Sequence, residues 1–303
     1  MPAYSLEDDL RRWGPGSAAP PPNLEEARAY CRRLARRHYE NFIVASWLLP
    51  RELMPHFFSV YAYCRWADDL ADETGDRLRA LELLEWWEQC LNDCYRGRAR
   101  HPVFVALTET IENFQIPETP FRDLLAAFRL DQRQTRWPTH DDLLAYCRKS
   151  ANPVGRIVLH LGRCAMPENA TLSDSVCTGL QLINFWQDIA RDRDRGRIYV
   201  PQASWSKHGV SEEDFFAESA GEPFRNMLAE EVENAEQFLE AGRPLVGRVG
   251  SILASEVELF IEGGLAVGRA IRRQRFDVLR RRPRVSRWKQ FGLLARAWWR
   301  QGR

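Results

Sequence analysis

The sequence lacks the patterns that indicate β-sheets, tandem repeats or membrane spans. No segment alternates apolar and polar residues, no Asn-Gly hairpin turn occurs, and no stretch is repeated along the chain. No stretch approaches the roughly 20 apolar residues that a membrane-spanning helix needs, and the N-terminal residues lack the apolar core of a secretory signal. We therefore predict an all-α fold with no membrane-spanning segment.

Paired cysteines are also absent. The seven cysteines are odd in number, are scattered over apolar segments and include no CxxC pair. A disulfide framework or a zinc site would need paired or clustered cysteines, so we expect buried, reduced thiols. This favours a cytoplasmic localisation, because thiols stay reduced there.

The net charge of +1 conceals an asymmetry. From Arg269 to the C-terminus, thirteen Lys and Arg residues stand against a single acid, Asp277, whereas residues 1–268 are acidic overall. A basic segment on an acidic body is typical of a protein that contacts an anionic surface. No motif for reading nucleic acids accompanies the charge, so we expect no nucleic-acid partner.

Residues 284–303 are predicted to form a basic amphipathic helix. Trp288, Phe291, Leu294 and Trp298 recur there at helical spacing among arginines and a lysine. This composition is typical of a helix that lies in a membrane interface, and it predicts peripheral contact with the inner membrane face. A basic helix packed on the acidic body explains the same pattern, and both interpretations are open.

The rest of the chain is predicted to consist of a leader and a helical body. Residues 1–22 are expected to be a flexible leader, because the Gly- and Pro-rich stretch 13–22 cannot form a helix. Residues 23–283 are expected to form one domain, with Asn23 as its first N-cap and Glu26 three residues later. Helical spacing and proline breaks predict helices over residues 23–38, 51–73, 76–95, 171–191, 224–241 and 251–274.

Two pairs of aspartates stand at the ends of apolar helical segments. Asp68 and Asp72 are four residues apart, and Asp188 and Asp192 repeat this spacing with Asn184 one turn earlier. Like charges at this spacing, near the negative end of a helix, repel each other. Magnesium binds carboxylates together with phosphate oxygens and would explain the pairs. One pair alone is readily a solvated acidic face, but two such pairs favour a magnesium-diphosphate site.

Arg65 precedes the first aspartate pair by about one helical turn. An intrahelical ion pair with Asp68 would contribute only about 0.3–0.5 kcal/mol to stability. A guanidinium is also well suited to bidentate binding of a diphosphate. The sequence leaves both roles open.

The segments around these residues resemble the squalene and phytoene synthase family. The resembling stretches are residues 48–50, 61–65, 68–72, 146–155, 181–192 and 196–201, in family order from about Leu24 to Phe276. The resemblance implies a single isoprenoid-synthase helical domain with a central active-site cavity. It also implies that two or three Mg²⁺ ions bind an isoprenoid diphosphate.

Variants within these stretches resemble the bacterial hydroxysqualene synthases of hopanoid biosynthesis. They are Tyr39-Glu-Asn41-Phe42, Asn152-Pro-Val-Gly155 and Trp186-Gln-Asp188. This resemblance implies conversion of presqualene diphosphate and water to hydroxysqualene and pyrophosphate, without NADPH. Met54 and Gln187 stand where relatives carry arginine. The loss of two positive charges suits an enzyme that handles one diphosphate per turnover.

The resemblance also implies a set of site residues. Asp68, Asp72, Asn184, Asp188 and Asp192 would bind metal, and Tyr146, Arg65 and Asn152 would take part in catalysis. Asn152 would hold the attacking water or, alternatively, cap a helix. The substrate-binding candidates are His38, Tyr39, Asn41, Phe42, Arg65, Gln181, Asn184, Trp186, Gln187 and Tyr199. Aromatic candidates for the cavity wall, each of which can instead be core packing, are Phe42, Trp47, Tyr61, Tyr146, Phe185 and Trp186.

Two other functions are open at this point. A presqualene diphosphate, dehydrosqualene or phytoene synthase would condense two prenyl diphosphates, and its products from farnesyl diphosphate would distinguish it. A lipid-binding or assembly homologue would keep the fold without catalysis. The intact set of four aspartates argues against that homologue, because their mutual repulsion would then serve no purpose.

Overall fold

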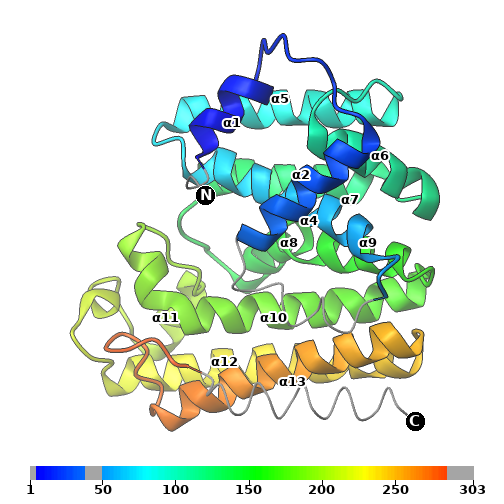
Figure 1. The fold of residues 1–303 in the computed structure, drawn as a ribbon. Coiled ribbons are helices and arrows are strands. Elements are labelled where there is room, and N and C mark those ends of the chain that lie inside the picture. Colours follow the sequence, from blue (N-terminus) through cyan, green and yellow to red (C-terminus); the bar gives the residue numbers. More distant parts are fainter. Residues whose placement is uncertain (1–4, 38–49, 285–303) are drawn as a thin grey trace. The chain divides into compact units, whose positions relative to one another are not determined.

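The computed structural model describes residues 5–37 and 50–284, without the side chain of Ile252, and every regular element in that part is a helix (Figure 1). The prediction of an all-α fold is confirmed. None of the described helices is long and apolar enough to cross a membrane. The predictions for His38, Tyr39, Asn41, Phe42 and Trp47, and for the tail beyond Arg284, lie outside the described residues.

The chain divides into two compact units, residues 1–133 and 134–303, and each is described by itself. The predicted boundaries of a single domain over residues 23–283 stay a prediction. The seven cysteines are all free, and Cys31, Cys94 and Cys147 are buried. Burial raises the pKa of these three thiols above the ordinary value, so they are inert thiols as expected.

The first unit is built around helix α4. Its helices are α1 (Leu6–Trp13), α2 (Leu24–Arg37), α4 (Met54–Asp72), α5 (Arg77–Tyr95), α6 (Pro102–Phe114) and α7 (Glu118–Asp131). Helix α4 packs against α2, α5, α6 and α7. The predicted capping box of α2 is confirmed, because Asn23 and Glu26 exchange side chain–backbone hydrogen bonds of 3.0 Å.

An aromatic core holds α4 in place. The rings of Trp66 and Trp87 stack with centroids 5.1 Å apart, and the ring of His101 meets both edge-on at 4.6 and 4.9 Å. The Tyr63 hydroxyl donates a hydrogen bond of 2.8 Å to the carbonyl of Phe121 on α7. These buried contacts fix the orientation of the helix whose last turn carries Asp68 and Asp72.

Helix α1 corrects the prediction of a flexible leader for residues 1–22. Acids in its first turn and arginines in its last turn complement the helix dipole. Leu6 is buried, and the Tyr30 hydroxyl on α2 donates a hydrogen bond of 2.5 Å to Asp9. The leader prediction rested on the prolines and overlooked this amphipathic segment. Residues 14–23 contain no helix, as their prolines require.

The second unit is built around helix α10. Its elements are α8 (His140–Ser150), α9 (Asn152–Leu161), α10 (Pro167–Asp194), α11 (Gln202–His208), η1 (Glu213–Phe216), α12 (Glu222–Gly242), η2 (Arg243–Gly247) and α13 (Ser251–Arg273). Helix α10 packs most extensively on α12 and also contacts α8, α9 and α13. It is longer than the predicted helix over residues 171–191, because Pro167 occupies its first turn, where proline needs no amide hydrogen.

Close contact between α10 and α12 depends on glycines. A Cβ atom on Gly179 of α10 would lie 2.8 Å from Leu239 Cγ and 2.9 Å from the Ala235 carbonyl oxygen of α12. Next to this contact, Val176, Leu239 and Ile261 form a buried core cluster shared by α10, α12 and α13. The rigid support places the last turns of α10, with Asp188 and Asp192, at a fixed position within the unit.

Candidate active site

The first aspartate pair lies in the last turns of α4, which ends at Asp72. Asp72 is exposed and the Asp68 side chain is 46% exposed, so both carboxylates are accessible. Asp69, between them in sequence, is fully buried. No basic residue occupies the last turn of this helix. The carboxylates therefore stand at a helix end whose dipole does not favour them.

Arg65 forms ion pairs within α4 and just beyond it. Its guanidinium contacts Asp69, lies 3.3 Å from the Asp68 carboxylate and donates a 3.1 Å hydrogen bond to Glu73. The ion-pair role that the sequence suggested is thus present, although the main partner is buried Asp69 rather than Asp68. Its role as a diphosphate clamp stays a prediction.

The second aspartate pair lies on the last two turns of α10. The Asp188 side chain is 22% exposed, and Asn184 is exposed one turn earlier. Burial and the neighbouring charge of Asp188 raise the pKa of Asp192 to about 7, against the opposing effect of nearby arginines. Two acids one turn apart in a half-buried place form a site where a cation is favoured.

Arg282 is a site residue that the sequence analysis missed. Its guanidinium donates two hydrogen bonds to the Asp188 carboxylate, one of them 2.9 Å long, and a third of 3.2 Å to Gln187. Gln187 is buried and donates a 2.7 Å hydrogen bond to the Pro283 carbonyl. The sequence signal was present in the three arginines at 280–282, which the analysis assigned to the basic C-terminal segment.

This arrangement corrects the charge argument based on Gln187. The sequence analysis inferred that glutamine in place of arginine leaves the site poorer in positive charge. In the structure, Arg282, which is distant in sequence, forms an ion pair with Asp188 and so supplies one positive charge beside the second aspartate pair. Gln187 holds the backbone beside that arginine, so it acts on the site through Arg282.

Four aromatic rings gather in the second unit. The rings of Phe185 and Tyr199 stack with centroids 3.8 Å apart, and Tyr146 lies 5.9 Å from Tyr199 and 6.2 Å from Phe185. Trp137, which sequence reasoning did not single out, lies 4.8 Å from Tyr146. The structure therefore brings together three candidates that come from two helices and a loop.

Two other candidates lie in packed surroundings. Trp186 is fully buried and donates a 2.9 Å hydrogen bond to the Glu231 carbonyl, and its substrate-binding role stays a prediction. Asn152 is buried and accepts a 2.9 Å hydrogen bond from the Thr178 hydroxyl. Asn152 is the first residue of α9, whose N-cap is Ala151, and both its water-holding role and the alternative capping role stay predictions. Gln181, on α10, is partly exposed.

The chemistry of the aspartate pairs fits magnesium. Within residues 5–37 and 50–284, no group of three or more His, Cys, Asp or Glu residues is arranged to hold a metal ion by itself. Magnesium needs no such cage, because it typically takes one or two carboxylates together with phosphate oxygens and waters. Burial and, after it, the charge of Asp188 raise the pKa of Asp192, and a bound cation would favour its ionised form.

The chain is similar to known proteins over most of its length. The squalene/phytoene synthase family model matches residues 35–289. The crystal structure of squalene synthase HpnC from Alicyclobacillus acidocaldarius is 44% identical, with a TM-score of 0.80, over 84% of this chain and 95% of that chain. A dehydrosqualene synthase crystallised with a ligand is 24% identical, with a TM-score of 0.82, over 92% of this chain and 98% of that chain, and shows the fold alone.

Curated relatives include phytoene synthases. Phytoene synthase 1 of Zea mays is 31% identical over 72% of this chain and 54% of its own length. The phytoene synthase of Arthrospira platensis is 26% identical over 89% of this chain and 92% of its own length. The chain thus spans about half the length of phytoene synthase 1 from Zea mays and from Solanum lycopersicum and nearly all of the cyanobacterial relative.

Proposed function

The chain belongs to the squalene/phytoene synthase family, and we propose that it is a hydroxysqualene synthase. In this reaction presqualene diphosphate and water give hydroxysqualene and pyrophosphate, and no NADPH is consumed. The observation that carries the proposal is the 44% identity with squalene synthase HpnC over nearly all of that protein, against 24–31% for the phytoene and dehydrosqualene synthases described above. The variant motifs around Asn152 and Gln187 support the same subfamily.

The aspartates are proposed to hold the diphosphate through magnesium. Asp68, Asp72, Asp188 and Asp192, with the amide oxygen of Asn184, would be the protein's ligands. Magnesium bound there would neutralise the charge that develops on the leaving pyrophosphate. Exposure of the side chains supports this role, because exposed groups can reach a ligand. Asp72 and Asn184 are exposed, and the Asp68 side chain is 46% exposed.

Arg282 and Arg65 are proposed to orient the carboxylates. Arg282 holds both oxygens of Asp188, which restricts the rotamer of that side chain. Arg65 forms an ion pair with the buried Asp69 and balances the charge around Asp68, 3.3 Å away. Oriented carboxylates bind metal and phosphate with less loss of side-chain entropy.

The aromatic cluster is proposed to face the carbocation. When the carbon–oxygen bond breaks, pyrophosphate leaves with the electron pair, and the remaining cyclopropylcarbinyl cation rearranges. The faces of Tyr146, Phe185 and Tyr199 attract positive charge, and their near-complete burial keeps water away during the rearrangement. Water then adds to the rearranged cation and loses one proton, which yields the alcohol.

The test is the choice between two substrates. Purified full-length protein with magnesium should convert presqualene diphosphate to hydroxysqualene without NADPH, and it should leave farnesyl diphosphate unchanged. Formation of presqualene diphosphate or dehydrosqualene from farnesyl diphosphate, or of phytoene from geranylgeranyl diphosphate, would assign the chain to the condensing enzymes instead. Turnover of none of these substrates would favour a non-catalytic homologue.

A further inference from the structure

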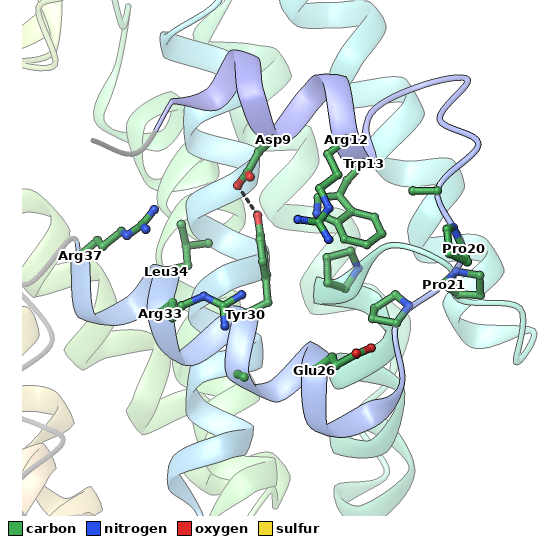
Figure 2. A pocket seen from close by; sticks show the side chains of 14 residues that line it. Asp9, Arg12, Trp13, Pro20, Pro21, Glu26, Tyr30, Arg33, Leu34 and Arg37 are labelled. Atoms are coloured by element: carbon green, nitrogen blue, oxygen red, sulfur yellow. Dashed lines mark hydrogen bonds between the residues drawn. The ribbon is translucent and has the colours of Figure 1, made fainter. Parts of the chain in front are cut away.

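A pocket of about 540 Å³ lies between α1, the proline segment 19–22 and α2 (Figure 2). It is contained entirely in the first unit and is distinct from the aspartates on α4. Its walls come mainly from residues that precede the matched range 35–289, so the family match assigns it no role. The volume is within the range of pockets that bind small organic ligands.

Three arginines line the pocket. Arg12 comes from α1, and Arg33 and Arg37 come from α2, as Figure 2 shows. Among the described residues, none of these three forms an ion pair with a carboxylate, although many arginines of the same unit do, Arg28 with Glu109 among them. The guanidinium of Arg12 lies over the ring of Trp13, 4.9 Å from its centroid, which holds it at the pocket wall.

The two acids of the pocket are engaged by other donors. Asp9 accepts its hydrogen bond from the Tyr30 hydroxyl, and burial raises its pKa despite the nearby arginines. Glu26 accepts a 3.0 Å hydrogen bond from the backbone N–H of Asn23, as part of the capping box of α2. Three arginines thus outnumber two acids that already have partners, and the pocket carries excess positive charge.

Part of the lining is apolar. Pro20 and Pro21 lie across the pocket from Arg33 and Arg37, and the ring of Trp13 lies beside Arg12 (Figure 2). We call Trp13, Pro20 and Pro21 the apolar wall. A bare anion would use only the arginines, whereas an anion with a short apolar arm would also contact the apolar wall. Guanidinium forks match the oxygens of a phosphate group.

We propose that this pocket binds a phosphate ester, with the phosphate held by Arg12, Arg33 and Arg37 and the apolar arm packed against Trp13 and the prolines. Two sources share this chemistry, a soluble organic phosphate and the head region of an anionic phospholipid. The site works without a metal, because the arginines supply all of the positive charge. This separates it from the proposed magnesium-dependent reaction.

The test is calorimetric titration of the full chain with phenyl phosphate in EDTA, which removes magnesium-dependent binding at the aspartates. The pocket variant is Arg12→Gln/Arg33→Gln/Arg37→Gln. The matched control, Arg11→Gln/Arg32→Gln/Arg36→Gln, removes the same charge from exposed positions of the same helices that do not line the pocket. We expect at least tenfold weaker binding by the pocket variant and a change within about twofold for the control.

Absence of binding by the wild type, or equal weakening in both variants, would overturn the proposal. Arg33→Gln alone, at an exposed position, keeps the test valid if the triple variant does not fold. Inorganic phosphate should bind more weakly than phenyl phosphate, and equal affinity would contradict the role of the apolar wall. A second arm measures cosedimentation with vesicles of phosphatidylglycerol. If the pocket variant cosediments less than the control variant, the ligand is a lipid head group. If the two variants cosediment equally, the ligand is a soluble ester.

Discussion

At the scale of single residues, Asp188 connects the second aspartate pair to Arg282. It accepts two hydrogen bonds from Arg282, and its charge contributes to the raised pKa of Asp192 one turn later. Removing its carboxylate would relieve a like-charge repulsion and remove an ion-pair partner of Arg282 and Arg191. The change should therefore impair chemistry much more than stability.

We predict that Asp188→Ala lowers turnover of presqualene diphosphate by at least about 100-fold. Its thermal midpoint should stay close to that of the wild type. The matched control is Asp194→Ala, two residues beyond Asp192 on the same helix, whose exposed carboxylate pairs with Arg193. That variant should keep its activity, as measured by pyrophosphate release. Full activity of Asp188→Ala would remove the metal-ligand role.

Glu256 on α13 is a buried acid that should make the stability of the folded protein depend on pH. It is 4% exposed, and neither carboxylate oxygen has a hydrogen-bond partner among residues 5–37 and 50–284. Burial raises its pKa from 4.5 to about 8. A neutral acid in the folded state and an ionised one in the unfolded state make folding less favourable as the pH rises through this window.

We predict that Glu256→Met stabilises the protein and that the gain grows with pH. Below about pH 4.5 both states of the wild type are protonated, so the acid costs little there. Between pH 4.5 and 8 its contribution should fall by on the order of 1.4 kcal/mol per pH unit. Denaturant unfolding at pH 5 and pH 8 measures the difference, with Glu233→Met, at an exposed position on α12, as the control. A gain that does not depend on pH would contradict the assignment.

At the scale of elements, the contact between α10 and α12 supports the second aspartate pair. Gly179→Ala should destabilise the protein by roughly 1–3 kcal/mol, because its methyl group would overlap Leu239 and the Ala235 carbonyl. Gly263→Ala, on α13, is the matched control, since its added Cβ would have no described atom within 4 Å apart from its chain neighbours and its own helix backbone. It should be neutral or stabilising by up to about 1 kcal/mol. Equal effects in denaturant unfolding would contradict the close-packing account.

Local patterns in the sequence predicted the helices, whereas contacts between residues distant in sequence were not predicted. The capping box at Asn23 and Glu26 and the apolar spacing of α4 are local, and both are found in the structure. The pairing of Arg282 with Asp188 joins residues 94 positions apart, and no local pattern encodes it. Helix α1 was missed because the prolines after it dominated the interpretation of the whole leader.

The candidate site was likewise predictable where it depends on local spacing and not where it depends on contacts between distant residues. Spacing alone predicted that each aspartate pair shares a helix face at a helix end, as found. It did not reveal that Tyr146 lies in an aromatic cluster with Tyr199, or that Trp186 is fully buried against α12, because both occupy apolar positions on helices. The packing of segments distant in sequence determines these surroundings.

At the scale of the whole molecule, the charge asymmetry predicts a role for the C-terminal segment. A chain lacking residues 285–303 should lose most of its binding to vesicles of phosphatidylglycerol, since about 1 kcal/mol of attraction accompanies each basic residue near an anionic surface. Flotation measures this, with phosphatidylcholine vesicles as the uncharged control. A second control replaces Trp288, Phe291 and Trp298 by serine and keeps every charge. Unchanged flotation of the truncated chain would mean that the tail is not a membrane contact.

The measurement that tests the central claim most directly follows the oxygen of the product. The account predicts that presqualene diphosphate, magnesium and the protein in ¹⁸O-labelled water, without NADPH, give hydroxysqualene with one ¹⁸O atom in its hydroxyl group. The label distinguishes capture of water by a carbocation from hydrolysis at phosphorus, which would keep the original carbon–oxygen bond. An unlabelled alcohol, or a hydrocarbon as the sole product, would contradict the account.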